Sequence, residues 1–334
     1  MKAIALLSGG LDSTLAAKVV IDHGIEVEAV NFLTVFCTCT NRGETCLASQ
    51  KAVETLGIPL KVFNVSEEFL DIVKHPKHGY GSNMNPCIDC RIFMLKESRA
   101  YMEASGASFV ITGEVLGQRP MSQRRDAMRL TERESGLEGL ILRPLSAKFL
   151  SATIPEKLGW VDREKLLNFQ GRSRKPQMKL AELFGIHDYP CPAGGCLLTV
   201  PGFAKRMRDL MEHTPDFSIN DVHLLKMGRH FRFSSKLKLV IGRNEGENEK
   251  IQTFAREEDI LLRLAHFPGS LSLLRGEPHD EEIGKAAAIA ARYSKAKGWE
   301  RAEVLYKKVS EQSYRSLSVL PLSEHEIKEL MICE

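Results

Sequence analysis

Short apolar runs alternate with amphipathic segments through the first half of the chain. The short runs are typical of buried strands, while the segments between them carry apolar residues at helical spacing. We predict strands over residues 3–7, 27–33, 60–65, 109–112 and 140–142. We predict helices over residues 13–20, 47–56 and 92–104, each followed by a glycine that is typical of a helix end. This alternation predicts a doubly wound α/β domain built on a parallel sheet.

The pattern changes in the second half of the chain. The alternation fades after about residue 145, and prolines and glycines interrupt the segment that follows. Strand-like runs at 237–241 and 260–264, followed by a helical run at 281–297, predict a smaller α+β domain at the C-terminal end. We therefore predict an ATP-binding domain at 1–150, a connecting and substrate region at 151–215, and a last domain at 216–334.

Composition places the chain among ordinary globular proteins. Hydrophobic residues make up 43% and charged residues 27%, and no apolar run approaches the ~18 residues needed to cross a bilayer. The apolar stretch near Met1 is too short for a signal peptide, so we expect a cytoplasmic protein. In a reducing compartment the eight cysteines favour metal binding or catalysis over disulfides.

Positive charge is concentrated in one part of the chain. Residues 141–210 contain 12 Lys and Arg against 6 Asp and Glu, with the cluster Arg172, Arg174 and Lys175 at its centre. A solvated protein face and a polyanion-binding surface are equally good interpretations of this cluster.

The first predicted strand runs directly into the segment Ser8-Gly9-Gly10-Leu11-Asp12-Ser13. Glycines expose backbone N–H groups, and the start of the following helix adds partial positive charge, so the segment suits a bound phosphate. It lacks the order of a Walker loop, which places a lysine on the terminal phosphates. The structural alternative is a tight turn in which Asp12 or Ser13 caps the helix.

This segment resembles the S-G-G-x-D-S loop of the PP-loop ATP pyrophosphatases, which cleave ATP between the α and β phosphates. The resemblance implies that the pyrophosphate is held by Ser8, Gly9, Gly10, Leu11, Asp12 and Ser13. It also implies a Mg²⁺ ion near Asp12, adenine beside Asn31 and Phe32, and a close approach of Gly113 to the nucleotide.

A C-x-x-C pair, Cys87 and Cys90, opens a predicted helix, where thiolates serve as nucleophiles or metal ligands. A third ligand is available from Cys196 or Cys191. The residues alone leave four interpretations open: a zinc site, a catalytic dithiol that relays sulfur through a persulfide, an iron–sulfur cluster with one open iron, and ordinary thiols. A looser group, Cys37, Cys39 and Cys46, is a candidate for zinc or for ordinary thiols.

The segment Asn85-Pro86-Cys87-Ile88-Asp89-Cys90 resembles the N-P-C-x-x-C element of tRNA thiolases related to MnmA, and the chain as a whole resembles the tRNA thiouridine synthases of the ThiI and MnmA type. The resemblance implies a [4Fe-4S] cluster on Cys87, Cys90 and Cys196, with Cys191 as the substitute for the third ligand.

Three segments of the second half, 221–232, 240–248 and 291–297, resemble the NFACT-R RNA-binding domain. The candidate phosphate contacts there are Arg229, His230, Arg232, Arg243 and Lys295, in addition to Arg172, Arg174 and Lys175. Phe231 and Tyr293 are candidates for stacking on bases, although each such residue taken alone is more often a surface charge or a core aromatic.

Together these resemblances imply ATP-dependent thiolation of a tRNA uridine, with 2-thiouridine and 4-thiouridine both open as products. Asp12 and the three cysteines are the expected catalytic residues, and Lys148, Arg119 and Gln118 are candidates for steadying phosphate or uridine. The expected partners are tRNA and a sulfur donor, either a cysteine desulfurase or inorganic sulfide, and no membrane. The alternatives are a pyrophosphatase acting on a small molecule and a non-catalytic RNA-binding factor.

Overall fold

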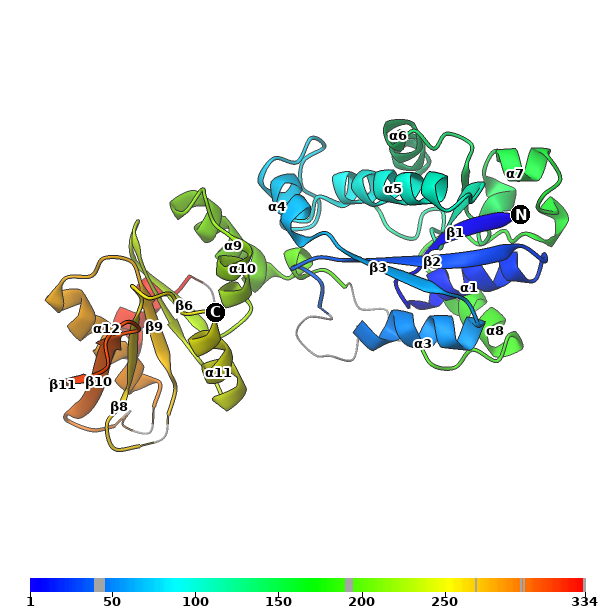
Figure 1. Cartoon of the computed structure of the whole chain (residues 1–334). Coiled ribbons are helices and arrows are strands. Elements are labelled where there is room, and N and C mark those ends of the chain that lie inside the picture. The colour runs from blue at the N-terminus through cyan, green and yellow to red at the C-terminus, as the bar shows by residue number, and fades with distance from the viewer. Residues whose placement is uncertain (39–45, 190–194, 268, 295, 297, 333–334) are drawn as a thin grey trace. The chain divides into compact units, whose positions relative to one another are not determined.

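The computed structural model describes residues 1–38, 46–189, 195–267, 269–294, 296 and 298–332 (Figure 1). The chain forms two compact units, Met1–Thr199 and Val200–Glu334. The division falls within the predicted connecting region 151–215, whose larger part packs into the first unit. Val161, Leu166, Ala181 and Ile186 all join the core beneath the first sheet.

The first unit is built on a parallel sheet with the strand order β3-β2-β1-β4-β5. Its strands are β1 (Lys2–Leu6), β2 (Glu26–Leu33), β3 (Leu60–Asn64), β4 (Phe109–Thr112) and β5 (Ile141–Leu142). All five predicted strands are confirmed to within one residue. Buried alanines, valines and isoleucines fill β1, β2, β4 and β5 on both faces, as expected of a sheet covered on both sides, whereas the edge strand β3 is partly exposed.

Helices cover both faces of this sheet, which confirms the doubly wound α/β fold (Figure 1). The helices are α1 (Leu11–Ile21), α3 (Cys46–Leu56), α4 (Ser66–Lys74), α5 (Cys87–Ala104), α6 (Arg125–Ser135), α7 (Ile154–Lys157) and α8 (Lys175–Leu183). Short 3-10 turns lie at Ala147–Phe149, Arg163–Lys165 and Leu197–Thr199. Helices α1 and α8 pack together over one face, and α5 with α6 over the other.

The second unit is an antiparallel sheet with the strand order β11-β10-β8-β9-β7-β6. Its strands are β6 (Arg229–Ser234), β7 (Leu237–Ile241), β8 (Ile260–Leu264), β9 (Ser272–Arg275), β10 (Ala302–Lys308) and β11 (Arg315–Val319). Its helices are α9 (Pro201–His213), α10 (Ile219–Leu225), α11 (Glu245–Thr253), α12 (Asp280–Arg292) and α13 (Glu324–Leu330). The predicted α+β character is confirmed, and the alanine-rich helix α12 packs on the core face of the sheet.

Within the described residues, no helix is both long enough and apolar enough to cross a membrane.

Candidate active site

The segment Ser8-Gly9-Gly10-Leu11-Asp12-Ser13, called the phosphate loop below, leads from β1 into α1. Hydrogen bonds from its own hydroxyl groups and from that of Thr14 close it. The hydroxyl of Ser13 donates to the backbone oxygen of Gly10 at 2.9 Å and accepts from the N–H of Ser8 at 3.3 Å. The hydroxyl of Thr14 also donates to the Gly10 oxygen, at 3.1 Å. The N–H groups in the first turn of α1 have no partner within the helix, so the closed loop presents donors suited to an anion.

Two glycines hold the loop at distances that only glycine allows. Gly9 has a φ of 75°, and a Cβ there would lie 2.3 Å from the backbone carbon of Ala48 on α3. A Cβ on Gly113, just after β4, would lie 2.5 Å from the backbone nitrogen of Ser13. Gly113, which is predicted to approach the nucleotide, thus lies in backbone contact with this loop, and α3 lies on the loop's other side.

A polar group surrounds the carboxylate of Asp12 at the start of α1. Gln118 donates to it at 2.8 Å, and the guanidinium of Arg174 lies 3.7 Å away. Gln177 on α8 in turn donates to Gln118 at 3.3 Å. Three buried atoms of the group have no hydrogen-bond partner, namely Oδ1 of Asp12, Nε of Arg174 and Oε1 of Gln177. Unpaired polar atoms gathered beside a phosphate loop indicate a place where a ligand completes the hydrogen bonding.

Two of these residues refine the sequence predictions. Arg174 belongs to the basic cluster assigned to RNA, but its guanidinium lies against Asp12, whereas Arg172 and Lys175 are exposed. Gln177 was not predicted at all. Gln177 differs from the other polar residues of α8 in being buried, and a single sequence does not show burial.

Four thiols form a second group in this unit. Helix α5 begins at Cys87 and carries Cys90 one turn later. Cys196 is paired with Cys37 across an isolated antiparallel bridge, in which the N–H of Thr38 donates to Gly195 and that of Leu197 to Phe36. Bonds on either side of the two cysteines define a non-hydrogen-bonded pair, the closer of the two antiparallel arrangements. Cys37, which the sequence placed in a separate group, therefore faces Cys196.

Burial raises the pKa of the Cys87, Cys90 and Cys196 thiols and so keeps them protonated. Burial, together with the nearby Cys196, Cys87 and Cys37, raises the pKa of Cys90 to about 12, although Arg91 acts to lower it. Burial likewise raises the pKa of Cys196 to about 12. The donor set has the chemistry that iron–sulfur clusters and zinc prefer. Within the described residues, however, no three His, Cys, Asp or Glu side chains are placed closely enough to hold a metal ion.

A buried carboxylate connects the phosphate loop to the thiols. Glu114 follows Gly113 directly, and its side chain lies 3.2 Å from Arg91, the neighbour of Cys90 on α5, and 2.9 Å from Arg143 after β5. Burial opposes ionisation of Glu114, but the two arginines outweigh it and hold its pKa below the ordinary value. The sequence analysis missed this residue, although an acidic residue directly after a buried strand was the available signal.

The remaining residues predicted to contact the nucleotide or uridine make other contacts within the protein. The side-chain amide of Asn31 donates to the backbone oxygen of Leu7 at 2.7 Å, and Phe32 is buried in the sheet. Lys148 donates to the backbone oxygen of Glu164 at 2.7 Å, so its ammonium already has a structural partner. Arg119 lies near Cys87 and lowers its pKa, although burial raises that pKa more.

The predicted RNA residues of the second unit are mostly engaged within the protein. His230 is 1% exposed, and its Nε2 bonds the backbone oxygen of Met227, so the prediction that it contacts phosphate is wrong. Phe231 is fully buried and cannot stack on a base. Arg232 binds both carboxylate oxygens of Asp209, at 3.0 and 2.6 Å, and Arg243 pairs with Glu247 at 2.7 Å.

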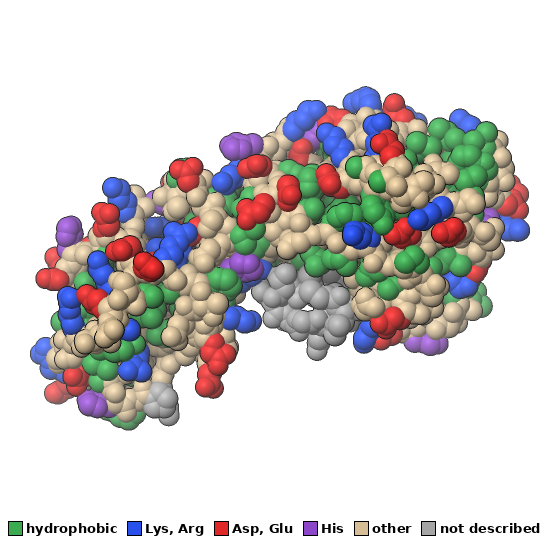
Figure 2. All heavy atoms as spheres, viewed as in Figure 1, with side chains coloured by type: hydrophobic (Ala, Val, Ile, Leu, Met, Phe, Trp, Pro, Cys, Tyr) green, Lys and Arg blue, Asp and Glu red, His purple; other side chains and the backbone are tan. Residues whose placement is uncertain are grey.

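Arg229 lies over the ring of Tyr293 at 4.7 Å. On the face of the molecule drawn in Figure 2, basic and acidic side chains are interspersed on both units. Three predicted residues, Cys39, Cys191 and Lys295, lie outside the described part of the chain, and so does the side chain of Cys46.

Two known families match the chain, and the two matches fall in different units. Residues 1–148 match the family described as thiamine biosynthesis protein (ThiI), and residues 228–331 match the NFACT protein RNA binding domain. Each match covers less than half of the chain. The range similar to ThiI contains the phosphate loop, the C-x-x-C pair and Glu114, whereas Arg174, Gln177 and Cys196 lie beyond it.

Curated relatives are similar over part of their length. A tRNA-specific 2-thiouridylase MnmA from Beutenbergia cavernae is 33% identical over 101 residues, which are 27% of each protein. The enzyme of the same name from Marinobacter nauticus is 26% identical over 229 residues, covering 64% of this chain and 55% of the relative. The chain thus spans between a quarter and about half of the length of these two relatives.

Two solved structures also overlap with the chain. A 4-thiouridine synthetase in complex with RNA and ATP has 19% identity and a TM-score of 0.38, over 67% of this chain and 52% of the other. The U34-tRNA thiolase NcsA from Methanococcus maripaludis, solved with its [4Fe-4S] cluster, has 20% identity and a TM-score of 0.33, over 67% and 70%.

Proposed function

We propose that this protein is an ATP-dependent tRNA thiolase, which replaces a carbonyl oxygen of a uridine by sulfur. The observation that carries the proposal is the continuous path from phosphate loop to thiols in the first unit. Ser13 contacts Gly113, and Glu114, the next residue, pairs with Arg91 beside the C-x-x-C motif. One half of this path suits ATP and the other suits sulfur, and the NFACT RNA-binding match supports tRNA as the acceptor.

The chemistry proposed for the loop is transfer of AMP to the uridine. The uridine oxygen attacks the α phosphorus of ATP, and the bond to the β,γ-pyrophosphate breaks. Sulfide, as HS⁻, then attacks the activated carbon and loses its proton, the carbon–oxygen bond breaks, and AMP leaves with the former uridine oxygen. The backbone donors at the start of α1 bind the pyrophosphate that leaves, because they are fixed in place before ATP arrives.

The unpaired Oδ1 of Asp12 is a suitable ligand for the Mg²⁺ ion that accompanies ATP. It is a buried carboxylate oxygen without a hydrogen-bond partner, and Mg²⁺ prefers carboxylate oxygens together with phosphate. Gln118 and Arg174 orient the carboxylate from its other oxygen.

Cys87, Cys90 and Cys196 are the residues that we propose to hold a [4Fe-4S] cluster. Their sulfur-only donor set fits such a cluster in kind, and a cluster held by these three residues would supply a Lewis-acidic iron for activating sulfur. Arg91 acts to lower the pKa of Cys87 and Cys90, and Arg119 that of Cys87, which favours the thiolate forms that any metal requires. Zinc binding and a persulfide relay use the same residues. Colourless zinc protein after anaerobic purification would argue against the cluster.

The nucleosides of tRNA from a deletion strain test this function. Mass spectrometry is expected to show one thiolated uridine missing, which returns when the wild-type gene is supplied and not when a Cys196→Ser gene is supplied. An unchanged set of thiolated uridines contradicts the proposal. The same comparison identifies the product as 2-thiouridine or 4-thiouridine, and inorganic sulfide or a cysteine desulfurase as donor is then distinguished with purified components.

A second candidate is sulfur transfer to a small molecule, because the matched family is described as a thiamine biosynthesis protein. In that case the deletion strain requires thiamine for growth and its tRNA is unchanged. A strain that loses the thiolated uridine but grows without thiamine excludes this candidate.

A further inference from the structure

The sheet of the second unit has two different faces at strands β8, β10 and β11. On one face Leu262, Val304 and Leu317 belong to the core that packs against α12. On the other face Arg263, Leu305 and Ser316 lie directly opposite one another across the three strands. Arg263 and Ser316 are exposed and Leu305 is only half-buried, so this second face is open.

Two cations on the open face share one aromatic ring. The guanidinium of Arg263 lies 4.5 Å from the ring centre of Tyr314, and the ammonium of Lys307 lies 5.1 Å from it. The ammonium also donates to the backbone oxygen of Glu311 at 2.8 Å. Among the ion pairs of the described residues, neither cation has a carboxylate partner. Contact with the ring holds both charges in place and leaves them available to an anion.

The arginines predicted to bind RNA lack this availability. Arg232 is bound by both oxygens of Asp209, and Arg243 by Glu247. To bind a phosphate, each must first give up a charge-assisted bond to its carboxylate, which offsets most of the gain. Arg263 and Lys307 give up only contacts with a ring and a carbonyl group. The open face is therefore the better phosphate-binding surface of this unit.

We propose that the open face of β8, β10 and β11 binds the phosphate backbone of RNA through Arg263 and Lys307. The inference rests on the proposed function for the identity of the RNA, which is tRNA. Tyr314 acts as a positioning residue that holds both cations beside one ring. Such contacts read the shape of the RNA and not its sequence, which suits recognition of folded tRNA.

The test compares two double variants of the full chain. R263A/K307A removes two positive charges from the open face. K308A/R315A removes two positive charges from neighbouring positions of the same sheet, which alternate to the opposite face and pair with Glu258 and Glu311. Matched thermal unfolding curves show that both variants fold. Binding of fluorescently labelled, deacylated tRNA is then measured at several salt concentrations.

We expect R263A/K307A to weaken tRNA binding at least tenfold and to lower the slope of log Kd against log salt by about 1.5, since each phosphate contact contributes about 0.7 to 0.9. K308A/R315A is expected to stay within twofold of the wild type. Equal weakening by both variants, or no weakening by either, overturns the proposal, and so does a wild-type protein that does not bind tRNA. The two proposals can fail separately. If R263A/K307A loses RNA binding but the deletion strain keeps all its thiolated uridines, the RNA-binding role of this surface stands and the thiolase function is rejected.

Discussion

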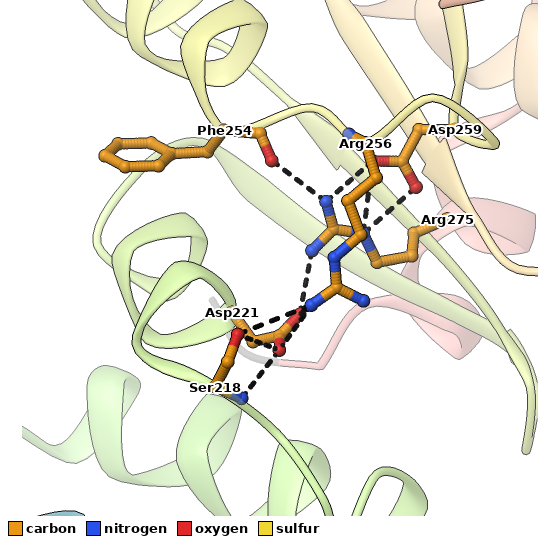
Figure 3. Close-up of polar contacts among 6 residues, drawn as sticks. All are labelled: Ser218, Asp221, Phe254, Arg256, Asp259 and Arg275. Atoms are coloured by element: carbon orange, nitrogen blue, oxygen red, sulfur yellow. Dashed lines mark hydrogen bonds and ion pairs between the residues drawn. The ribbon is translucent and has the colours of Figure 1, made fainter. Parts of the chain in front are cut away.

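Each unit buries a group of charged and polar side chains, and the two groups differ in how fully they are paired. In the second unit Asp221 and Asp259 lie between Arg256 and Arg275, and every carboxylate oxygen has a partner (Figure 3). In the first unit Asp12, Arg174 and Gln177 each bury a polar atom without a partner. A fully paired network holds a fold together, whereas an incompletely paired one loses stability unless a ligand completes it.

The paired network joins distant parts of the second unit. Asp221 lies on α10, Arg275 on β9, and Arg256 with Asp259 in the turn before β8. The backbone N–H and the hydroxyl of Ser218 complete the coordination of Asp221. If pairing indicates a structural role, damage here must unfold the second unit and leave ATP binding by the first unit unchanged.

The largest effect is expected from Asp221→Ala. The substitution leaves Arg256 and Arg275 without their shared carboxylate, and breaking a buried pair in this way costs about 3–5 kcal/mol. Urea unfolding is expected to show this loss in the transition of the second unit. ATP affinity, measured by calorimetry, serves as the control and stays unchanged. A loss of less than about 1 kcal/mol contradicts the structural role of the network.

Acid is expected to weaken the same network. Burial tends to raise the pKa of Asp221, but the Ser218 N–H and the two arginines hold it below its ordinary value of 3.8. The carboxylate therefore stabilises the fold above pH 4, and that contribution is lost as the pH falls through the lowered pKa. The difference in unfolding free energy between wild type and Asp221→Ala should shrink below pH 4. A difference that stays constant down to pH 2 contradicts this account.

Gly113→Ala is expected to damage both stability and nucleotide binding. Its Cβ would lie 2.5 Å from the backbone of Ser13, so the loop must move, at a cost of about 1–3 kcal/mol. ATP binding should be lost with it. Gly284→Ala is the matched control, because nothing lies within 4 Å of its added Cβ. That helical substitution should stabilise the chain by about 0.5–1 kcal/mol. Normal ATP affinity in Gly113→Ala refutes the role of this contact.

Asp12→Asn is expected to separate function from stability. The amide preserves the shape of the side chain but removes the charge proposed to bind Mg²⁺, so formation of AMP should fall at least tenfold. The free energy of unfolding should stay within about 0.5 kcal/mol, because the native group is incompletely paired. A large loss of stability would make Asp12 part of a structural network like that of Asp221.

The smallest effect concerns Cys37 and Cys196. Cysteines in a non-hydrogen-bonded antiparallel pair lie at a separation that a disulfide can span. Treatment with diamide, which takes two electrons from the two thiols, is expected to link them without changing the fold. Peptide mass spectrometry identifies the link, and Cys37→Ser should abolish it. A disulfide between Cys87 and Cys90 instead indicates that the bridge does not govern thiol reactivity.

The sequence predicted the features that depend on local pattern. All five parallel strands and the phosphate loop follow from short apolar runs and from glycines next to Asp12 and Ser13. Features that depend on long-range packing were not predictable in this way. Gln177 reaches the loop only because α8 packs beside α1, and Cys37 meets Cys196 across an isolated bridge.

Charge in the second unit shows the same limit. A sequence shows that Arg232 and Arg263 are both basic. It does not show that Arg232 is bound by the carboxylate of Asp209, whereas Arg263 lies over the ring of Tyr314. His230 failed as a candidate for the same reason, because it is buried and its ring bonds the backbone oxygen of Met227. The pairing of each cation, which only the fold determines, decides which face is available to RNA.

The most direct test of the central claim uses purified protein, ATP, Mg²⁺, sulfide and tRNA from the deletion strain under anaerobic conditions. The account predicts one AMP and one pyrophosphate for each thiouridine formed, with formation of both at least tenfold lower in Asp12→Asn. Cys196→Ser should form no thiouridine although it still binds ATP. Thiouridine formed without AMP, or formed normally by Cys196→Ser, would contradict the joining of an ATP loop to a thiol site.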